Sequence, residues 1–190
     1  GDALGYAYTP ANWFRPDFNL SKSYGPSGDD HKNRGPAYLV LAREPVQLFK
    51  SIGLDEPSAW HLVNFFTFLL GVYFVYRLSL RWMLPAAAFG AAALFSTQPL
   101  LWGHAFINPK DMPFLVFFTG ALLFGFEMVD KFNREEEKTT KNSSRFSSFI
   151  SRSDLSSLLL PSFFLGIATS IRVLAPIAGV LVVIYAILRY

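Results

Sequence analysis

Apolar residues in this chain gather into long runs that begin near position 59. The runs cover residues 59–80, 84–102, 113–129, 155–171 and 174–188, and charged residues return in short groups between them. An α-helix needs roughly 20 residues to cross the hydrocarbon core of a bilayer, and each run is close to that length. The pattern therefore predicts five transmembrane helices.

The last two runs could also form one hydrophobic segment from Leu155 to Leu188, and Arg172 decides between these interpretations. In one long helix Arg172 would lie near the middle of the membrane, where an unpaired charge costs about 2.5 to 3.5 kcal/mol. A break between Ile171 and Pro176 moves Arg172 to a membrane face. We therefore expect two short helices.

Two polar segments separate or precede the apolar runs. Residues 1–57 are rich in Gly, Pro, Asn and Asp, which predicts an ordered loop outside the membrane. Within this loop we expect one short helix from Pro36 to Arg43 and a second that starts at Pro45 and ends near Gly53, both lying against lipid or protein. Residues 130–154 are rich in Ser, Lys and Glu and predict a solvated, mobile loop.

The basic residues predict how the chain is oriented. Arg77 and Arg81 at the end of the first run, the Lys and Arg residues of segment 130–154 and Arg189 would share one side of the membrane, which the positive-inside rule makes cytoplasmic. The first polar segment, the loop from Gly103 to Met112 and Arg172 would then share the outer face. Three segments that are distant in sequence would meet there, as a functional site requires.

Composition supports a membrane protein and excludes several other classes. Of the 190 residues, 52% are apolar and only 16% are charged, whereas about a quarter of a soluble domain is charged. The absence of cysteine excludes disulfides, thiolate metal sites and cysteine nucleophiles. A net charge of +3 without a stripe of basic and aromatic residues argues against nucleic acid as a partner. The chain has no initiator Met or signal peptide, so we expect a fragment of a longer protein.

The loop between the second and third runs carries the most chemically distinctive residues. Asn108, Lys110 and Asp111 supply an amide, a cation and a carboxylate within four positions. In one interpretation Asp111 caps the next helix and Lys110 extends to the lipid headgroups. In the other, Lys110 binds a lipid phosphate, while Asn108 and Asp111 hydrogen-bond a sugar hydroxyl or orient a neighbouring side chain.

Other candidates on the outer side also have two interpretations. Asp2 is either a helix cap or solvated residue, or a general base that takes a proton from an acceptor. Lys32, Arg34 and Arg172 are each suited to anchoring at the interface, and together with Lys110 they would form a phosphate cradle.

Metal ligation has weaker support in the sequence. Asp29, Asp30 and His31 could form a metal cluster, although the Gly and Pro residues just before them favour a solvated turn. We expect His61 and His104 to form hydrogen bonds at the interface rather than to bind metal, because no second His or carboxylate stands at a helical ligand spacing.

Several pieces of the chain resemble the GT-C glycosyltransferases, and in particular their family 39 branch of protein O-mannosyltransferases and lipid A aminoarabinose transferases. These pieces are the Asp2-x-x-x-Tyr6 segment, the Gly-Pro-Ala-Tyr sequence at 35–38, the Asn-Pro-Lys-Asp-x-Pro-Phe loop at 108–114 and the small-residue segment from Gly166 to Arg172. The resemblance covers nearly the whole chain, as the N-terminal half of such an enzyme. Its most specific motif is the loop at 108–114.

The resemblance implies an all-α polytopic protein of a bacterial or archaeal plasma membrane, with GT-C-like helices and a long first outer loop that contains short juxtamembrane helices. It implies inverting transfer of a sugar from a polyprenyl-phosphate-linked donor to a protein, lipid or glycan acceptor at the outer face. Asp2 would be the base. The substrate-binding residues would be Lys110, Asp111, Asn108, Arg172, Arg34, His104 and Tyr6.

Two points of this interpretation differ from a complete enzyme of the family. Many relatives have Asp-Glu where this chain has Asp2 followed by Ala3, so a divalent cation is left open as a cofactor. The fragment alone is expected to be inactive, because the first helix and the later helices would be missing.

Two rival classes explain part of the sequence. A transporter or flippase of lipid-linked saccharides would need the same phosphate-binding cations but no base. It would also favour inverted repeats or charges in the middle of spans, and the sequence has neither. A noncatalytic membrane scaffold would explain the spans but would leave the loop at 108–114 without a role.

Overall fold

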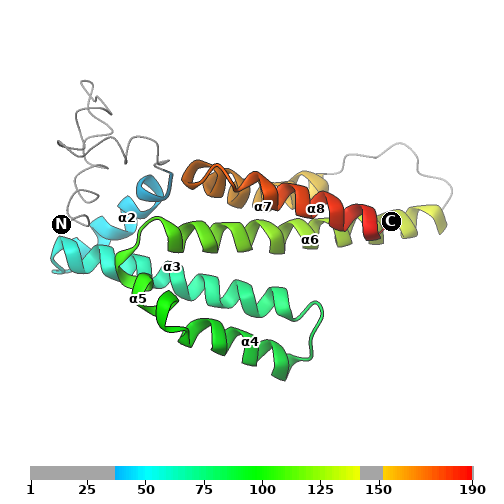
Figure 1. Ribbon diagram of the computed structural model, residues 1–190. Coiled ribbons are helices and arrows are strands. Elements are labelled where there is room, and N and C mark those ends of the chain that lie inside the picture. Colours follow the sequence, from blue (N-terminus) through cyan, green and yellow to red (C-terminus); the bar gives the residue numbers. More distant parts are fainter. Residues whose placement is uncertain (1–36, 142–151, 190) are drawn as a thin grey trace.

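The computed structural model describes residues 37–141 and 152–189, with side chains described for 37–134 and 157–189, and the secondary-structure elements of these residues are all α-helices (Figure 1). The prediction of an all-α fold is confirmed for this part of the chain. Its seven helices are α2 Ala37–Ser51, α3 Glu56–Ser79, α4 Pro85–Thr97, α5 Pro99–Ile107, α6 Asp111–Lys141, α7 Arg152–Ile171 and α8 Pro176–Arg189.

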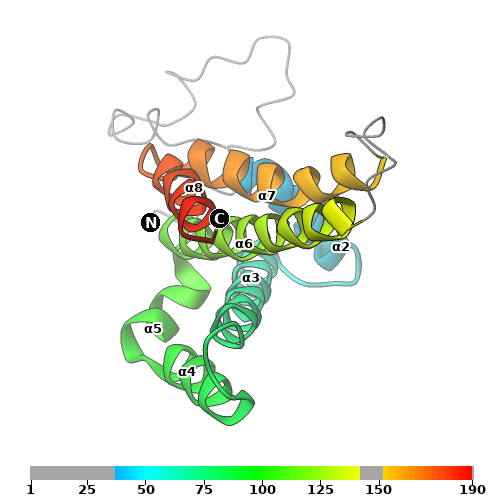
Figure 2. The same cartoon turned by 90° about the vertical axis from the view of Figure 1, so that its right-hand side faces the viewer.

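Helix α6 lies at the centre of the bundle. It packs between α3 on one side and α7 and α8 on the other, while α4 and α5 return along the far side of α3 (Figures 1 and 2). Val116 and Leu123 of α6 are fully buried in the main core, together with Phe74 of α3 and Phe164 of α7. The apolar side chains of α6 thus hold α3 and α7 in place.

Small residues allow the helices to approach α6 closely. A Cβ atom at Gly71 of α3 would lie 2.7 Å from a methyl group of Val116, and one at Gly120 of α6 would lie 2.5 Å from the Phe164 ring. Gly125 of α6 meets Val182 of α8 in the same way. Close approach at small residues is typical of helix packing in membranes.

The start of α3 follows local capping rules. Gly53 has φ of +103°, the left-handed region that favours glycine, just after α2 ends. Asp55 then caps α3, because its Oδ2 accepts a hydrogen bond from the Ser58 N–H at 3.3 Å. Hydrogen bonding to Ser58, through its side chain first and its backbone N–H second, lowers the pKa of the Asp55 carboxyl below its usual range.

The prediction of two short helices before the first span was wrong, because α2 is one continuous helix that passes through Pro45. Its buried residues are spaced by one helical turn and form a stripe on both sides of the proline: Tyr38, Leu39, Ala42 and Val46. Packing of this stripe on the bundle offsets the hydrogen bond that Pro45 cannot donate.

The prediction of one helix over 84–102 was also wrong. Gln98 is extended, with φ of −65° and ψ of 124°, and it separates α4 from α5. The ring of Pro99 disfavours helical geometry at the preceding residue, which explains the break. Proline is well tolerated as the first residue of α5.

The predicted loop at 130–154 is helical at both of its ends. Helix α6 continues to Lys141, and α7 begins at Arg152. The sequence from Arg134 to Lys138 consists of Arg, Glu and Lys, which are good helix formers, so the helix can extend beyond its apolar part. The break between α7 and α8 is where it was predicted, after Ile171 and before Pro176.

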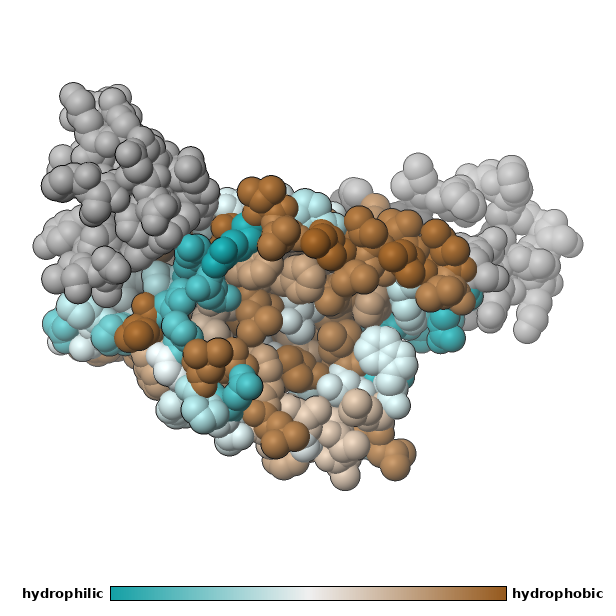
Figure 3. All heavy atoms as spheres, viewed as in Figure 1, coloured by the Kyte–Doolittle hydropathy of each residue, from teal (hydrophilic) through white to brown (hydrophobic). Residues whose placement is uncertain are grey.

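Within the described residues, two helices are long and apolar enough to cross a membrane, judged by length and composition: Glu56–Ser79 and the Asp111–Arg134 part of α6. Shorter apolar helices accompany them at Pro85–Thr97, Ser157–Ile171 and Pro176–Arg189. Large apolar side chains are exposed along α4, α7 and α8, and Figure 3 shows them as extensive brown areas. Such an exterior is typical of a surface that contacts lipid or protein.

Candidate functional site

The connection between α5 and α6 is organised by Asn108. Its Oδ1 accepts hydrogen bonds from the backbone N–H groups of Lys110, at 3.1 Å, and Asp111, at 2.8 Å. These bonds satisfy N–H groups at the start of α6 that have no partner within the helix. The capping role that one interpretation assigned to Asp111 therefore belongs to Asn108.

His104 extends this arrangement into α5. Because Asn108 Oδ1 faces the two backbone donors, its Nδ2 amino group faces His104 Nδ1 at 3.2 Å and Asp111 Oδ2 at 3.0 Å. An amino group can only donate, so His104 Nδ1 accepts. The neutral ring then carries its proton on Nε2, which makes Nε2–H available as a donor.

Arg172 joins this loop from a distant part of the chain. It lies in the turn between α7 and α8, where its backbone N–H donates to Ala168 O at 2.9 Å. Its guanidinium donates to Asp111 Oδ1, which closes an ion pair across 61 positions of sequence. About half of the Asp111 side chain and 39% of the Arg172 side chain are exposed, so this pair orients the arginine more than it stabilises the fold.

The structure thus brings four of the predicted site residues into one hydrogen-bonded chain: His104, Asn108, Asp111 and Arg172. Lys110 lies in the same loop, between Asn108 and Asp111. The predicted base Asp2 and the predicted ligands Tyr6 and Arg34 lie outside the described residues, as do Lys32 and the Asp29–His31 group. Among the described side chains, no group of three or more His, Asp or Glu residues could hold a metal ion.

A buried polar cluster beside this site was missed by the sequence analysis. The Tyr38 hydroxyl donates to Asn64 Oδ1 at 2.7 Å and lies 3.0 Å from the Thr67 hydroxyl. Asn64 Nδ2 donates to the backbone carbonyl of Phe106 at 3.2 Å. Burial raises the pKa of the Tyr38 hydroxyl above its usual range. The signal in the sequence was a lone amide, Asn64, inside an apolar run.

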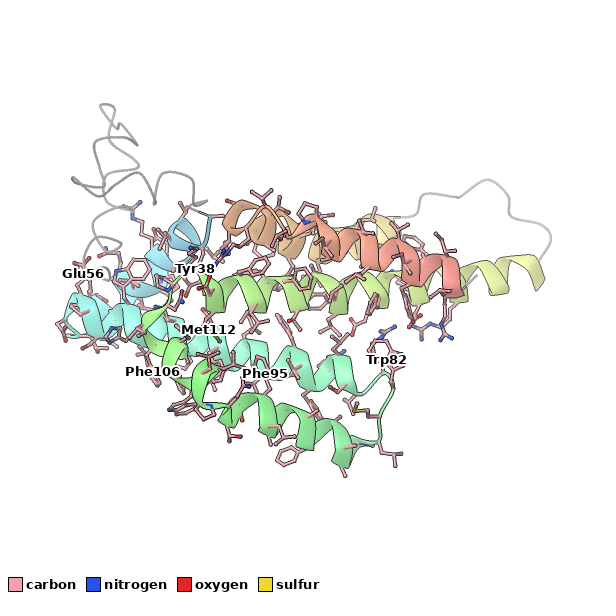
Figure 4. The ribbon with its side chains drawn as sticks, in the orientation of Figure 1. Tyr38, Glu56, Trp82, Phe95, Phe106 and Met112 are labelled. Carbon is pink, nitrogen blue, oxygen red and sulfur yellow. The ribbon has the colours of Figure 1, made fainter. Side chains whose placement is uncertain are left out.

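This buried cluster connects α2 and α3 to the last turn of α5. Figure 4 shows Tyr38, Phe106 and Met112 at the same end of the bundle. The carbonyl of Phe106 is one of the last four in α5, which lack partners within the helix, and Asn64 supplies one. Since Phe106 precedes Asn108 by two residues, the cluster helps to fix the site.

Stacked aromatic rings hold α5 against α3. The rings of Phe65 and Phe106 are parallel within 5° and 4.7 Å apart, and Trp102 meets Phe65 edge-on at 5.8 Å. Such aromatic pairs add about 0.5–1.5 kcal/mol each beyond their buried area. His104 is therefore presented from a helix with a well-packed aromatic face.

A second polar cluster lies at the opposite end of the bundle, and we call it the Asp130 cluster: Arg81, Asp130, Tyr185 and Arg189. Asp130 Oδ2 accepts from Arg81 at 2.5 Å, while Oδ1 accepts from the Tyr185 hydroxyl at 2.8 Å and from Arg189 Nε at 3.5 Å. This cluster joins the region just after α3 to α6 and α8.

Comparison of the chain with protein-family models, curated proteins and solved structures finds no match. The functional interpretation therefore rests on the sequence and on the geometry of the His104–Arg172 hydrogen-bonded chain and the Asp130 cluster.

Proposed function

We propose that the protein is a multi-pass membrane glycosyltransferase that moves a sugar from a polyprenyl-phosphate-linked donor to an acceptor at the outer membrane face. The observation that carries this proposal is the convergence of Asn108, Asp111 and Arg172, with Lys110 in the same loop, at one end of an apolar helix bundle.

The spacing of charges along α6 supports a membrane-spanning bundle. Asp111 belongs to the hydrogen-bonded chain of His104, Asn108, Asp111 and Arg172, which we call the outer cluster, and Asp130 belongs to the Asp130 cluster. The two aspartates are 19 positions apart, or about 28 Å along an α-helix. The hydrocarbon core of a bilayer is about 30 Å thick. Residues 112–126 between them include no charged residue. The two clusters would then lie at the two faces of the membrane.

The outer cluster has the chemistry that a lipid-linked phosphate needs. Arginine and lysine are the usual phosphate partners, arginine through paired N–H groups and lysine as a point charge. Asp111 holds one terminal nitrogen of Arg172 and so orients the remaining N–H donors. In this role Asp111 and Asn108 position the cation, and His104 Nε2–H is suited to donate to a sugar hydroxyl.

The proposed reaction is a single displacement. Asp2 takes a proton from the acceptor, whose oxygen or nitrogen forms a bond to the anomeric carbon. The bond between this carbon and the phosphate oxygen breaks, and its electron pair stays on the departing polyprenyl phosphate. Arg172 and Lys110 stabilise that charge, which is larger in the transition state than in the bound donor.

The test is the release of polyprenyl phosphate by the purified full-length protein, supplied with candidate polyprenyl-phosphate sugars and acceptors. Asp2→Asn should abolish release while donor binding survives, and unchanged turnover would contradict the assignment of the base. Arg172→Gln should lower turnover by on the order of 10²-fold, the usual effect of removing one fixed donor to a developing charge.

A matched control uses another arginine of the described bundle. Arg43→Gln removes the same charge from α2, a helix that supplies none of the residues of the outer cluster, and it should leave turnover near the wild-type value. If the protein instead moves the intact donor across vesicle membranes without releasing polyprenyl phosphate, the flippase interpretation replaces this one.

A further inference from the structure

The Asp130 cluster carries more positive charge than its carboxylate neutralises. One carboxylate, Asp130, is shared by the guanidinium groups of Arg81 and Arg189. Within the Asp130 cluster two guanidinium groups therefore accompany one carboxylate, which leaves one positive charge without a matching negative charge.

The two arginines of the cluster have different surroundings. The guanidinium of Arg81 lies 5.4 to 5.8 Å from the rings of Trp82, Phe126 and Tyr185, and its side chain is only 15% exposed. Such cation–π contacts hold Arg81 in place. Arg189 Nε lies 3.5 Å from Asp130 Oδ1, Tyr185 is also a neighbour, and the Arg189 side chain is 61% exposed.

We propose that the Asp130 cluster binds the phosphate of an anionic phospholipid headgroup, with Arg189 as the contacting cation and Arg81 as part of its fixed support. The inference rests on the proposed membrane-spanning bundle but not on glycosyl transfer. Arginine suits this role because its fork of N–H donors matches two phosphate oxygens.

Trp82 supports a location at the level of the headgroups. It follows Arg81 directly, the residue is 62% exposed, and its ring meets Phe126 edge-on at 6.0 Å. Figure 4 shows Trp82 at the end of the bundle opposite Tyr38 and Glu56. Tryptophan is enriched where membrane and water meet, because its ring is apolar and its N–H is polar.

The net positive charge of the Asp130 cluster selects the kind of lipid. Phosphatidylcholine has a phosphate but no net charge, whereas phosphatidylglycerol carries one negative charge. A positively charged cluster near the membrane surface attracts phosphatidylglycerol more strongly, and each basic residue changes the affinity about fivefold. We therefore expect preferential retention of phosphatidylglycerol.

Native mass spectrometry of the purified full-length protein tests the proposal by measuring lipid retained after equilibration with phosphatidylglycerol or phosphatidylcholine. The wild type should retain phosphatidylglycerol in preference. Arg189→Gln should lower that retention about fivefold, whereas Arg189→Lys should keep most of it because the charge remains. Arg43→Gln, which removes the same charge at the other end of the bundle, should change nothing.

Three results would overturn the proposal. These are equal retention of the two lipids by the wild type, an equal loss in Arg43→Gln and Arg189→Gln, and displacement of bound lipid by excess inorganic phosphate. The last result would assign the cluster to soluble anions. Thermal unfolding of each variant shows whether it is folded. If Arg189→Gln is unfolded, Arg189→Lys still tests whether a positive charge at this position preserves lipid retention. Release of polyprenyl phosphate, measured in parallel, distinguishes failure of the lipid-binding proposal from failure of the proposed glycosyltransferase activity.

Discussion

The substitution Gly120→Ala tests whether α6 and α7 approach as closely as the structure indicates. The added Cβ atom would lie 2.5 Å from Cδ1 and 2.9 Å from Cε1 of Phe164. Phe164 has little room to move, because it is 7% exposed and its ring lies 5.2 Å from the Phe74 ring and 5.1 Å from the Phe124 ring. The substitution therefore forces overpacking.

The magnitude follows from two opposing effects. Overpacking a well-filled core costs about 1–3 kcal/mol. Alanine in place of a helical glycine regains up to about 1 kcal/mol through its higher helix propensity. Gly166→Ala on α7 is the matched control, because a Cβ atom there has no atom within 4 Å and only the propensity effect remains. The difference in unfolding free energy between these variants isolates the overpacking, about 1–3 kcal/mol.

Reversible unfolding in detergent, followed by circular dichroism, measures this difference. Adding Phe164→Leu to Gly120→Ala should recover part of the loss, because the smaller side chain makes room for the methyl group, and a double-mutant cycle would give a favourable coupling energy. If Gly120→Ala were as stable as Gly166→Ala, the close contact between α6 and α7 would be refuted.

Three further substitutions test individual polar contacts. Tyr38→Phe leaves buried Asn64 Oδ1 without its hydroxyl donor, which should cost about 1–3 kcal/mol of unfolding free energy, and an unchanged value would contradict the buried cluster. Asp55→Ala removes the cap of α3 and should lower the melting temperature at pH 7. Because the cap lowers the folded-state pKa of Asp55, its contribution is present above the unfolded pKa of about 3.9 and is lost as the pH falls through the folded value. The melting temperatures of wild type and Asp55→Ala should therefore converge in acid. A difference in melting temperature that does not change with pH would contradict stabilisation by the ionised Asp55 cap. Asp111→Asn should change the unfolding free energy by less than about 1 kcal/mol, because its pair with Arg172 is partly exposed, while polyprenyl phosphate release falls; normal release would argue against a positioning role.

Features that depend on residues close together in the sequence were predictable from the sequence. The break after α7 was predicted because an unpaired Arg172 in the middle of the membrane would be costly, and its position in the apolar run is visible in the sequence. Two other local signals were present but misjudged. They are Pro99, which separates α4 from α5, and the helix-forming residues that extend α6 beyond Asp130.

The candidate site was predictable as a set of residues but not as a set of contacts. The loop at 108–114 and Arg172 could be assigned to one face by orienting the apolar runs. Whether Asp111 would cap its own helix or hold a neighbouring side chain stayed open, because both roles suit a carboxylate at that position. Asn108 takes the capping role in the structure and leaves Asp111 for Arg172.

The sequence by itself determined the helical class, the apolar runs and the residues with candidate chemistry, because these depend on composition and on short-range spacing. Only the tertiary structure decided which groups meet. The Asp111–Arg172 pair spans 61 positions and the Tyr38–Asn64 hydrogen bond spans 26. Such contacts depend on how α2, α5 and α7 pack around α3 and α6, and that packing follows from the shapes of buried side chains and glycines on several helices at once.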